Sequence, residues 1–211
     1  MPDGAVSHLA SQNDGDMALD VLLSRRSMSP ALLGDPAPGE EDLNDILDAA
    51  LRAPDHGRLR PWRFVIVRGT AREELGALFA DALWAREPDA SAKALENERQ
   101  RAFRGPLIIC VGASLNSEHA VPEVEQVLSV GAAVMNMLNA VHALGYGAMW
   151  VTGKRCYDAG VNEALGFGPP DRLVGFLHVG TPTEPAHPTE RPVRADHVSE
   201  WTGPLNGSSL V

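Results

Sequence analysis

The chain has 211 residues, of which 44% are hydrophobic, and it carries a net charge of −10. This length suits one domain, and this composition is enough to bury a core. The acidic balance argues against nucleic-acid binding and against anionic membrane surfaces. Two cysteines provide no disulfide framework and the first ten residues show no signal peptide, so we predict a cytoplasmic protein.

The apolar spacing of the chain predicts helices and strands in alternation. Helices are expected at residues 17–25, 40–53, 70–86, 89–103, 122–144 and 159–165. Strands are expected at residues 62–67, 107–113, 146–152 and 173–179. Residues 1–15 are predicted to form a flexible leader, and residues 28–39, which hold three prolines, a loop. The alternation is typical of an α/β domain.

Two local signals define the ends of predicted helices. Thr70-Ala71-Arg72-Glu73 has the pattern of a capping box, and Gly145 is expected to stop the longest helix. That helix is apolar on nearly all sides, so we expect it to be central and buried. Asn136, Asn139 and His142 interrupt its apolar run, which argues against a membrane span.

The last part of the sequence is rich in proline. Prolines occupy positions 182, 185, 188, 192 and 204. This density forbids a regular helix and predicts an extended C-terminal arm from about residue 181, lying over a surface that we expect to be a partner's. Residues 16–211, including the arm, are interpreted as one domain.

A first group of basic residues follows the first predicted helix. Arg25-Arg26-Ser27 provides two guanidinium groups and a hydroxyl, which together are suited to hold a phosphate. In an acidic chain, such focused positive charge favours an anionic ligand. Arginines at the C-terminus of a helix also complement its dipole, and this alternative stays open.

A second basic group surrounds two prolines after the second predicted helix. It consists of Arg52, His56, Arg58 and Arg60. The prolines stiffen the segment and lower the entropic cost of presenting these side chains to a ligand. Binding residues are often found on such anchored loops, although a solvated basic loop is an equally open alternative.

The third predicted strand ends in Trp150-Val151-Thr152-Gly153. Ligands commonly bind at the carboxyl ends of strands in α/β sheets. A planar aromatic side chain followed by a polar turn would line a ring-shaped cofactor. A core tryptophan beside a turn glycine is the alternative.

The sequence has no motif for chemistry carried by its own side chains. The seven histidines lack the spacing of metal ligands, and neither a nucleophile elbow nor a phosphate-binding loop is present, so no metal site and no catalytic residue are predicted. Glu123 and Glu125 are interpreted as surface charges that match the dipole of the longest helix. Basic neighbours would lower the pKa of Cys156, but a small filler residue is the favoured interpretation. We expect a cofactor to carry the chemistry.

Six segments together resemble the FMN-dependent nitroreductase family, most of all its compact NAD(P)H nitroreductase branch. They read L-L-S-R-R-S (22–27), I-L-D-A-A-L-R-A-P-D-H with a following P-W (46–62), F-R-G-P-L-I-I (103–109), G-A-A-V-M-N-M (131–137), G-Y-G-A-M-W-V-T-G (145–153) and V-G-F-L-H-V-G-T-P (174–182). Each segment alone is a weak signal, but six in order are a strong one.

The resemblance implies an α+β homodimer with a mainly antiparallel central sheet flanked by helices and two FMN sites at the subunit interface. The residues that would hold FMN are Arg25, Arg26, Ser27, Arg52, His56, Arg60, Trp150, Val151, Thr152 and Gly153. Of these, Arg52 and His56 would reach across the dimer. The residues that would contact the nicotinamide nucleotide are Ala140, Val141, His142, Ala143, Leu144 and Gly145.

One loop departs from the family pattern. Many members carry P-S-S-x-N-x-Q-P-W after the second helix, whereas this chain carries P-D-H-G-R-L-R-P-W at residues 54–62. The usual serine, asparagine and glutamine contacts are therefore absent. His56 and Arg60 are expected to take their place at the flavin.

The reaction implied by the resemblance is ping-pong transfer of electrons from NADH or NADPH, through FMN, to a nitroaromatic, quinone or related small-molecule acceptor. Positive groups near the flavin would stabilise its anionic reduced form. Other chemistry on the same scaffold, such as reductive dehalogenation or flavin breakdown, is one alternative. A non-catalytic flavin-binding protein and a plain interaction module that uses the proline-rich arm are two others.

Overall fold

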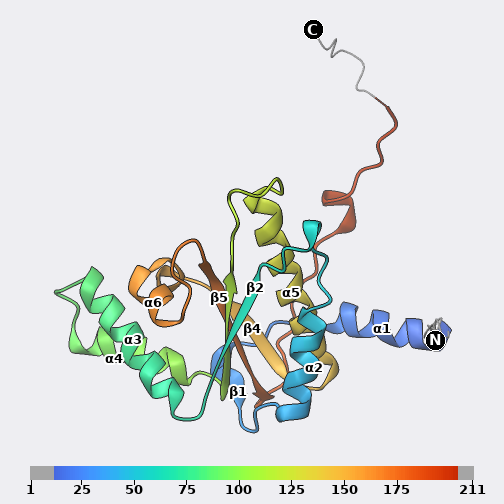
Figure 1. Cartoon of the computed structure of the whole chain (residues 1–211). Helices are drawn as coiled ribbons and strands as arrows, with labels where there is room; N and C mark the ends of the chain where they lie inside the picture. Colours follow the sequence, from blue (N-terminus) through green and yellow to red (C-terminus); the bar gives the residue numbers. More distant parts are fainter. Residues whose placement is uncertain (1–11, 204–211) are drawn as a thin grey trace, which may run out of the picture.

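A five-stranded antiparallel sheet forms the centre of the molecule (Figure 1). The computed structural model describes residues 12–203. The helices are α1 (Gln12–Ser24), α2 (Glu40–Ala50), α3 (Ala71–Arg86), α4 (Ala92–Arg99), α5 (Glu123–Ala143) and α6 (Ala159–Ala164). The strands are β1 (Leu33–Gly34), β2 (Trp62–Arg68), β3 (Leu107–Ala113), β4 (Gly147–Val151) and β5 (Arg172–Pro182). Short 3₁₀ turns include η2 (His56–Arg58) and η4 (Lys154–Tyr157).

The strand order is β1-β5-β3-β2, and β4 also pairs with β5. Every pairing is antiparallel. The α+β class implied by the resemblance is therefore confirmed, whereas the α/β pattern inferred from alternation alone is wrong. The reason lies between β2 and β3, where α3 and α4 pack against each other as a helical hairpin and return the chain to the end of the sheet that it left.

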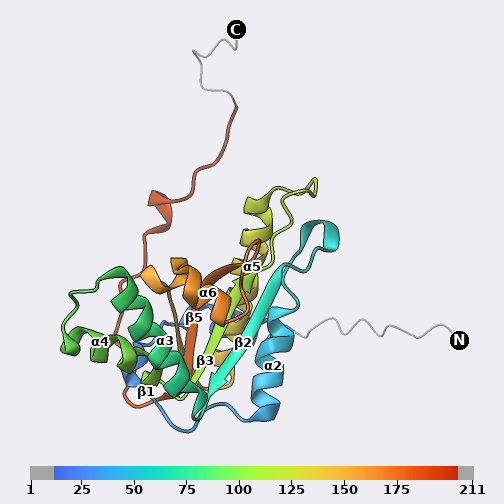
Figure 2. The same cartoon turned by 60° about the vertical axis from the view of Figure 1, so that its left-hand side comes forward.

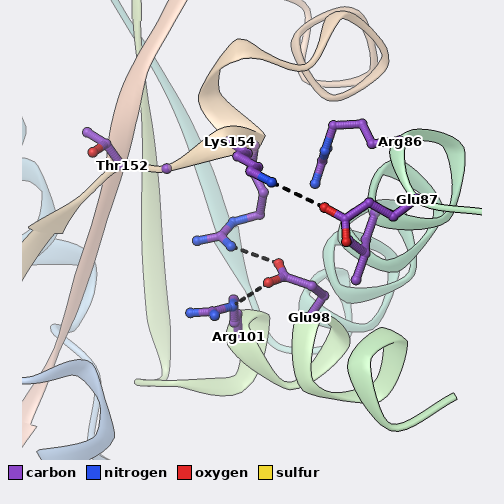
Figure 3. Close-up of a pocket in the computed structure, with 9 residues that line it drawn as sticks. Arg86, Glu87, Glu98, Arg101, Thr152 and Lys154 are labelled. Carbon is purple, nitrogen blue, oxygen red and sulfur yellow. Dashed lines mark hydrogen bonds and ion pairs between the residues drawn. The ribbon is translucent and has the colours of Figure 1, made fainter. Parts of the chain in front are cut away.

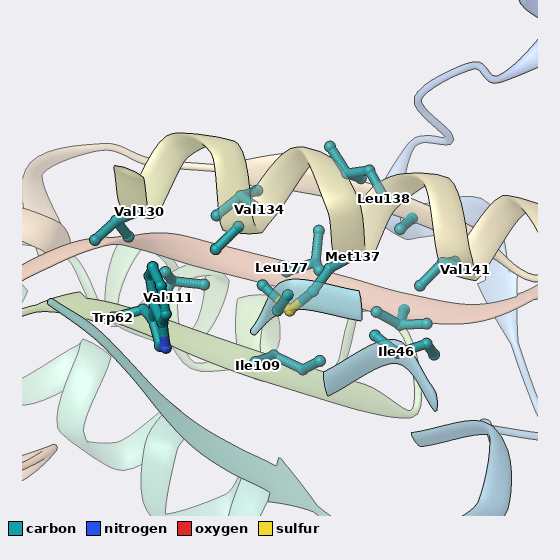
Figure 4. Close-up of a cluster of buried hydrophobic side chains, with 14 of the residues drawn as sticks. Ile46, Trp62, Ile109, Val111, Val130, Val134, Met137, Leu138, Val141 and Leu177 are labelled. Carbon is teal, nitrogen blue, oxygen red and sulfur yellow. The ribbon is translucent and has the colours of Figure 1, made fainter. Parts of the chain in front are cut away.

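Helices cover both faces of the sheet, as the turned view shows (Figure 2). β3 is buried along its whole length and alternates between two clusters of apolar side chains. Ile109 and Val111 face α2 and α5, as the close-up shows (Figure 4), whereas Ile108 and Cys110 face α3 and α6. Ile46 of α2 is fully buried in the first cluster. The continuous apolar run of β3 thus reflects burial on two sides.

The structure differs from the predicted elements near several ends. α1 begins at Gln12, so residues 12–15 are helical instead of part of a leader, and residues 1–11 lie outside the described chain. The predicted capping box does not form, because Thr70 itself has helical backbone angles and its side chain makes no capping hydrogen bond. β1 lies in the predicted loop over residues 28–39, where its two residues pair with the end of β5.

Gly145 ends α5 as predicted. It adopts a φ of 85°, and its amide donates to His142 O at 3.1 Å, while the Tyr146 amide donates to Val141 O at 3.0 Å. These two bonds form a Schellman motif, in which the residue after the helix must enter the left-handed region. The turn directs the chain straight into β4.

The burial of α5 is one-sided. Val130, Val134, Met137 and Val141 pack on the sheet, as predicted for a central helix, but Val124 and Leu128 are 63% and 66% exposed. Among the described residues, α5 is the one helix whose length and composition would let it cross a membrane. The core helices of soluble proteins meet the same criterion, and α5 packs against α2, β3 and β4.

His178 on β5 makes stability depend on pH. Its side chain is 5% exposed, its Nδ1 lies 2.6 Å from Arg104 O, and burial lowers its pKa. Below pH about 6.5 the imidazole of His178 becomes protonated in the unfolded chain, whereas in the folded chain it stays neutral until the pH is lower. We therefore expect the free energy of unfolding to fall as the pH is lowered below that value. The free energy of unfolding, measured by urea denaturation, should differ less between pH 7.5 and pH 5.5 in His178→Asn than in wild type. An equal difference in the two proteins would contradict this.

Candidate functional site

The predicted phosphate loop, Arg25 to Ser27, follows α1 and lies beside β4. The next residue, Met28, is buried, and its amide donates to Ala148 O of β4 at 2.9 Å. Nη1 of Arg25 is buried and has no hydrogen-bond partner among the described residues. A buried guanidinium donor without an acceptor is costly, so this atom fits an anion that would complete it.

The C-terminal arm is tied to this loop. Nη1 of Arg26 donates to His187 O at 3.1 Å, and Nη2 of Arg191 donates to Arg25 O at 2.8 Å. Beyond Arg191 the described part of the arm is exposed and runs away from the body, with one short 3₁₀ turn at Arg194–Asp196 (Figure 1). The absence of a regular helix in residues 183–203 agrees with the proline density of this segment. Residues 204–211 lie outside the described chain.

Predicted site residues line three of the cavities of the structure. The first, the α1–β4 cavity, has a volume of about 310 Å³ and includes Arg26, His142 and Gly145 in its lining. Nε2 of His142 lies 2.9 Å from Ser24 Oγ, which joins the end of α5 to the end of α1. This cavity thus brings one predicted phosphate residue together with two residues predicted to contact the nicotinamide nucleotide.

The second, the α1–α2–α5 cavity, has a volume of about 480 Å³ and a mainly apolar lining. Arg52 enters it from the turn after α2, and Ala140 and Ala143 from α5. Asn139 also lines it, and its Oδ1 is buried without a partner among the described residues. Val141, in contrast, is 1% exposed and packs in the core, and Leu144 is 38% exposed at the end of α5.

Polar residues within α5 connect this helix to α1 and α2. Asn136, Asn139 and His142 are spaced by three and therefore lie on one face of the helix. Nδ2 of Asn136 donates to Ala49 O of α2 at 3.0 Å, and His142 contacts α1. This face holds α1 and α2 against α5 around the second cavity.

The loop over residues 54–61 is pinned to α5. Nδ1 of His56 lies 2.6 Å from Glu125 Oε2, and Ser129 Oγ donates to Pro54 O at 2.8 Å. Arg58 and Arg60 have φ of 56° and 51°, in the left-handed region that non-glycine residues seldom adopt. Strain of this kind concentrates at functional sites. Sequence reasoning treated Glu125 as a surface charge and missed its contact with His56.

Trp150 lies across β5, where residue 175 must be glycine. A Cβ atom there would lie 2.2 Å from Trp150 Nε1. Trp150 is still 38% exposed, so part of its surface remains accessible to a ligand. The carboxyl end of β4 does not by itself mark a ligand site, because an antiparallel sheet places carboxyl and amino ends of its strands at the same edge. The exposed aromatic surface is the better reason to keep Trp150 as a candidate.

Thr152 and Gly153 belong to the third cavity, the α3–β4 cavity, which has a volume of about 410 Å³ (Figure 3). The structure therefore distributes part of the predicted site residues over three separate cavities of one chain, while Arg25, Ser27, His56, Arg60, Trp150 and Val151 line none of these three. Arg26, His142 and Gly145 are brought together, and so are Arg52, Ala140 and Ala143.

The cysteines show no sign of thiol chemistry. Both are free and buried. Burial raises the pKa of Cys110 to about 12 and also raises that of Cys156, where nearby Arg155 counteracts burial only in part. The filler interpretation of Cys156 holds, and the lowered pKa suggested by its basic neighbours is wrong. No group of His, Cys, Asp or Glu within the described part of the chain could hold a metal ion.

Comparison with known proteins settles the family. Residues 22–181 match the nitroreductase family. The chain belongs to the nitroreductase family. It is 42% identical over 165 residues to the Escherichia coli protein named "Putative NAD(P)H nitroreductase YdjA", which covers 78% of this chain and 88% of the relative. A Haemophilus influenzae protein of the name "Putative NAD(P)H nitroreductase" is 35% identical over 170 residues, with 80% and 90% covered.

Solved structures agree with this family assignment. A nitroreductase-like protein from Bacillus cereus has a TM-score of 0.76 at 22% identity, with 88% of this chain and 96% of that chain covered. The crystal structure described as a putative nitroreductase in complex with FMN, from Desulfovibrio desulfuricans, has a TM-score of 0.64 at 27% identity and covers 88% and 98%. The chain therefore has the nitroreductase fold.

Proposed function

We propose that this nitroreductase-family chain is an FMN-dependent oxidoreductase that takes electrons from NADH or NADPH and passes them to nitroaromatic, quinone or related small molecules. The observation that carries the proposal is the buried Nη1 of Arg25, which has no acceptor among the described residues. It lies in the loop that the family resemblance assigns to the flavin phosphate. The curated relatives named as NAD(P)H nitroreductases and the FMN-bound structure from Desulfovibrio desulfuricans support it.

The residues divide the work of holding FMN. Arg25, with Arg26 and Ser27, would bind the phosphate and the polar edge, because guanidinium groups pair with phosphate through charge-assisted hydrogen bonds. The exposed surface of Trp150, with Val151 to Gly153, would support the ring. When bound, FMN supplies the redox chemistry, accepting hydride from NAD(P)H and releasing electrons to the acceptor in a ping-pong sequence.

A second copy of the chain would complete each site. Arg52, His56 and Arg60 lie on the segment that follows α2 and line neither the cavity that holds Arg26 nor the one that holds Thr152, so in our proposal they reach the flavin of the other subunit. Exposed apolar side chains support an interface between copies. They are Leu22 and Leu23 on α1, Val124 and Leu128 on α5, and Val193, Val198 and Trp201 on the arm.

Electrostatics would favour the reduced flavin. A reduced FMN ring is anionic, and fixed positive groups near it lower the energy of that form. His56 is held by Glu125, and the Arg60 amide donates to Asp55 Oδ2 at 2.7 Å, so the imidazole of His56 and the backbone of Arg60 are held in place before any ligand arrives. We also propose a cytoplasmic location, which two free, buried thiols and the bacterial relatives support.

The purified protein should be yellow, with the two visible absorption bands of a flavin. Anaerobic addition of NADH or NADPH should bleach them, and a nitroaromatic or quinone should restore the colour. A flavin spectrum without bleaching would indicate a non-catalytic flavin-binding protein. Bleaching without turnover of these acceptors would favour other chemistry on the scaffold. A colourless protein that takes up no added FMN would overturn the proposal.

A further inference from the structure

The α3–β4 cavity is lined by an unusual concentration of positive charge. Arg86 comes from α3, Arg101 from the turn after α4, and Lys154 and Arg155 from η4, immediately after the residues proposed to support the flavin ring (Figure 3). The chain as a whole carries a charge of −10. A concave surface focuses the field of such a cluster and raises the local concentration of anions.

The ion pairs of this cluster leave one positive charge in excess. Glu98 is shared by Arg155 and Arg101, each at 2.8 Å. Lys154 pairs with Glu87 at 3.2 Å, and Arg86 pairs with Asp158 at 2.7 Å. Four cations thus meet three carboxylates, and one further anionic group would balance them.

Two arginines of the cavity are held in place and still have hydrogen-bond donors without an acceptor. Arg155 is 11% exposed, and its guanidinium lies 4.9 Å from the centre of the Phe79 ring. The Nε atoms of Arg86 and Arg155 are buried and have no hydrogen-bond partner among the described residues. Each of these two guanidinium groups therefore keeps one donor without an acceptor in addition to the carboxylate with which it pairs.

Two further features concern the residues of the lining that adjoin the proposed flavin site. Gly153 has φ 126° and ψ −175°, a conformation open almost only to glycine, and it forms part of the wall. Thr152 adds a hydroxyl, and Lys154 is 75% exposed and flexible enough to swing toward a ligand.

We propose that the α3–β4 cavity binds the phosphate monoester group of a ligand, with Lys154, Arg86 and Thr152 as its first contacts. Binding of the phosphate itself requires no flavin. Its role in the reaction rests on the proposed function: because the cavity adjoins Trp150 to Gly153, the group would be the 2′-phosphate of NADPH or a phosphate carried by the electron acceptor.

The chain offers a matched pair of variants, because Lys154 and Lys93 are its two lysines. Lys93 is exposed on α4 and does not line the cavity. Titration calorimetry with inorganic phosphate at low ionic strength should show saturable binding to the full-length protein. Lys154→Gln should weaken it about tenfold, as expected for the loss of one charge-assisted contact, and Lys93→Gln should not. Absent binding, or equal binding in the two variants, would overturn the proposal and leave the cluster as a structural ion-pair network.

Kinetics separate the two sources of the phosphate. If the cavity takes the 2′-phosphate of NADPH, Lys154→Gln should raise the ratio of KM for NADPH to KM for NADH about tenfold, while Lys93→Gln leaves the ratio unchanged. An unchanged ratio in Lys154→Gln, together with weakened phosphate binding, would assign the site to a phosphate of the acceptor. A protein that binds phosphate but holds no FMN would contradict the proposed function and would leave the proposal of a phosphate site intact.

Discussion

Replacing Arg25 by alanine should weaken FMN binding by about 30-fold, because a guanidinium contact with a phosphate contributes roughly 2 kcal/mol. The fold should survive. Arg25 Nη1 makes no hydrogen bond within the described chain, so the substitution removes a buried donor that the protein alone does not satisfy. The dissociation constant of FMN, measured by quenching of flavin fluorescence, and the urea midpoint of the apoprotein test both statements.

Two further variants sharpen this test. Arg25→Lys keeps the charge but loses the planar fork, so it should bind FMN with intermediate affinity. Arg99→Ala removes an equally charged residue from the surface of α4, where Arg99 pairs with Glu96 at 3.0 Å, and should leave FMN affinity unchanged. If Arg25→Ala binds FMN as tightly as Arg99→Ala, Arg25 has no role in holding the phosphate.

The main elements of the fold follow from local sequence patterns. β2 and β3 begin at the predicted residues because short continuous apolar runs bounded by turn residues are typical of buried strands. β1 could not be found this way, since its two residues are a strand only through pairing with Thr181 and Pro182 at the far end of the chain. The start of α1 was missed because Asn13, Asp14 and Gly15 are poor helix formers.

The site was predictable in its residue types and not in its arrangement. A cluster of arginines in an acidic chain is visible in the sequence. The partner of His56 is not, because Glu125 lies 69 residues away and meets it only through the packing of η2 on α5. In the sequence, Asn139 differs from its surroundings only as a polar residue in an apolar helix. That polarity argues against a membrane span and does not indicate that Asn139 lines a cavity. The separation of Arg52 from Thr152 into different cavities depends on the sheet order, which local patterns do not encode.

Replacing Gly112 by alanine should destabilise the fold by about 3 kcal/mol. Gly112 lies on β3 where its register with β5 shifts, and a Cβ atom there would lie 2.2 Å and 2.3 Å from two carbons of the Phe167 ring. Phe167 is 2% exposed, so the ring has no free space to move into. The φ of Gly112 is not in the left-handed region, so the expected loss comes from the steric contact alone.

A double-mutant cycle isolates that contact. Phe167→Ala alone should cost about 3–5 kcal/mol, because it leaves a cavity. In Gly112→Ala/Phe167→Ala the added methyl group fills part of this cavity, so the double variant should lose less than the sum of the two single losses. Gly168→Ala, next to Phe167 but with no atom beyond its two chain neighbours within 4 Å of its new Cβ, should change stability by less than about 1 kcal/mol. Strictly additive losses in urea denaturation would mean that Gly112 is required for its backbone and not for the space it leaves to Phe167.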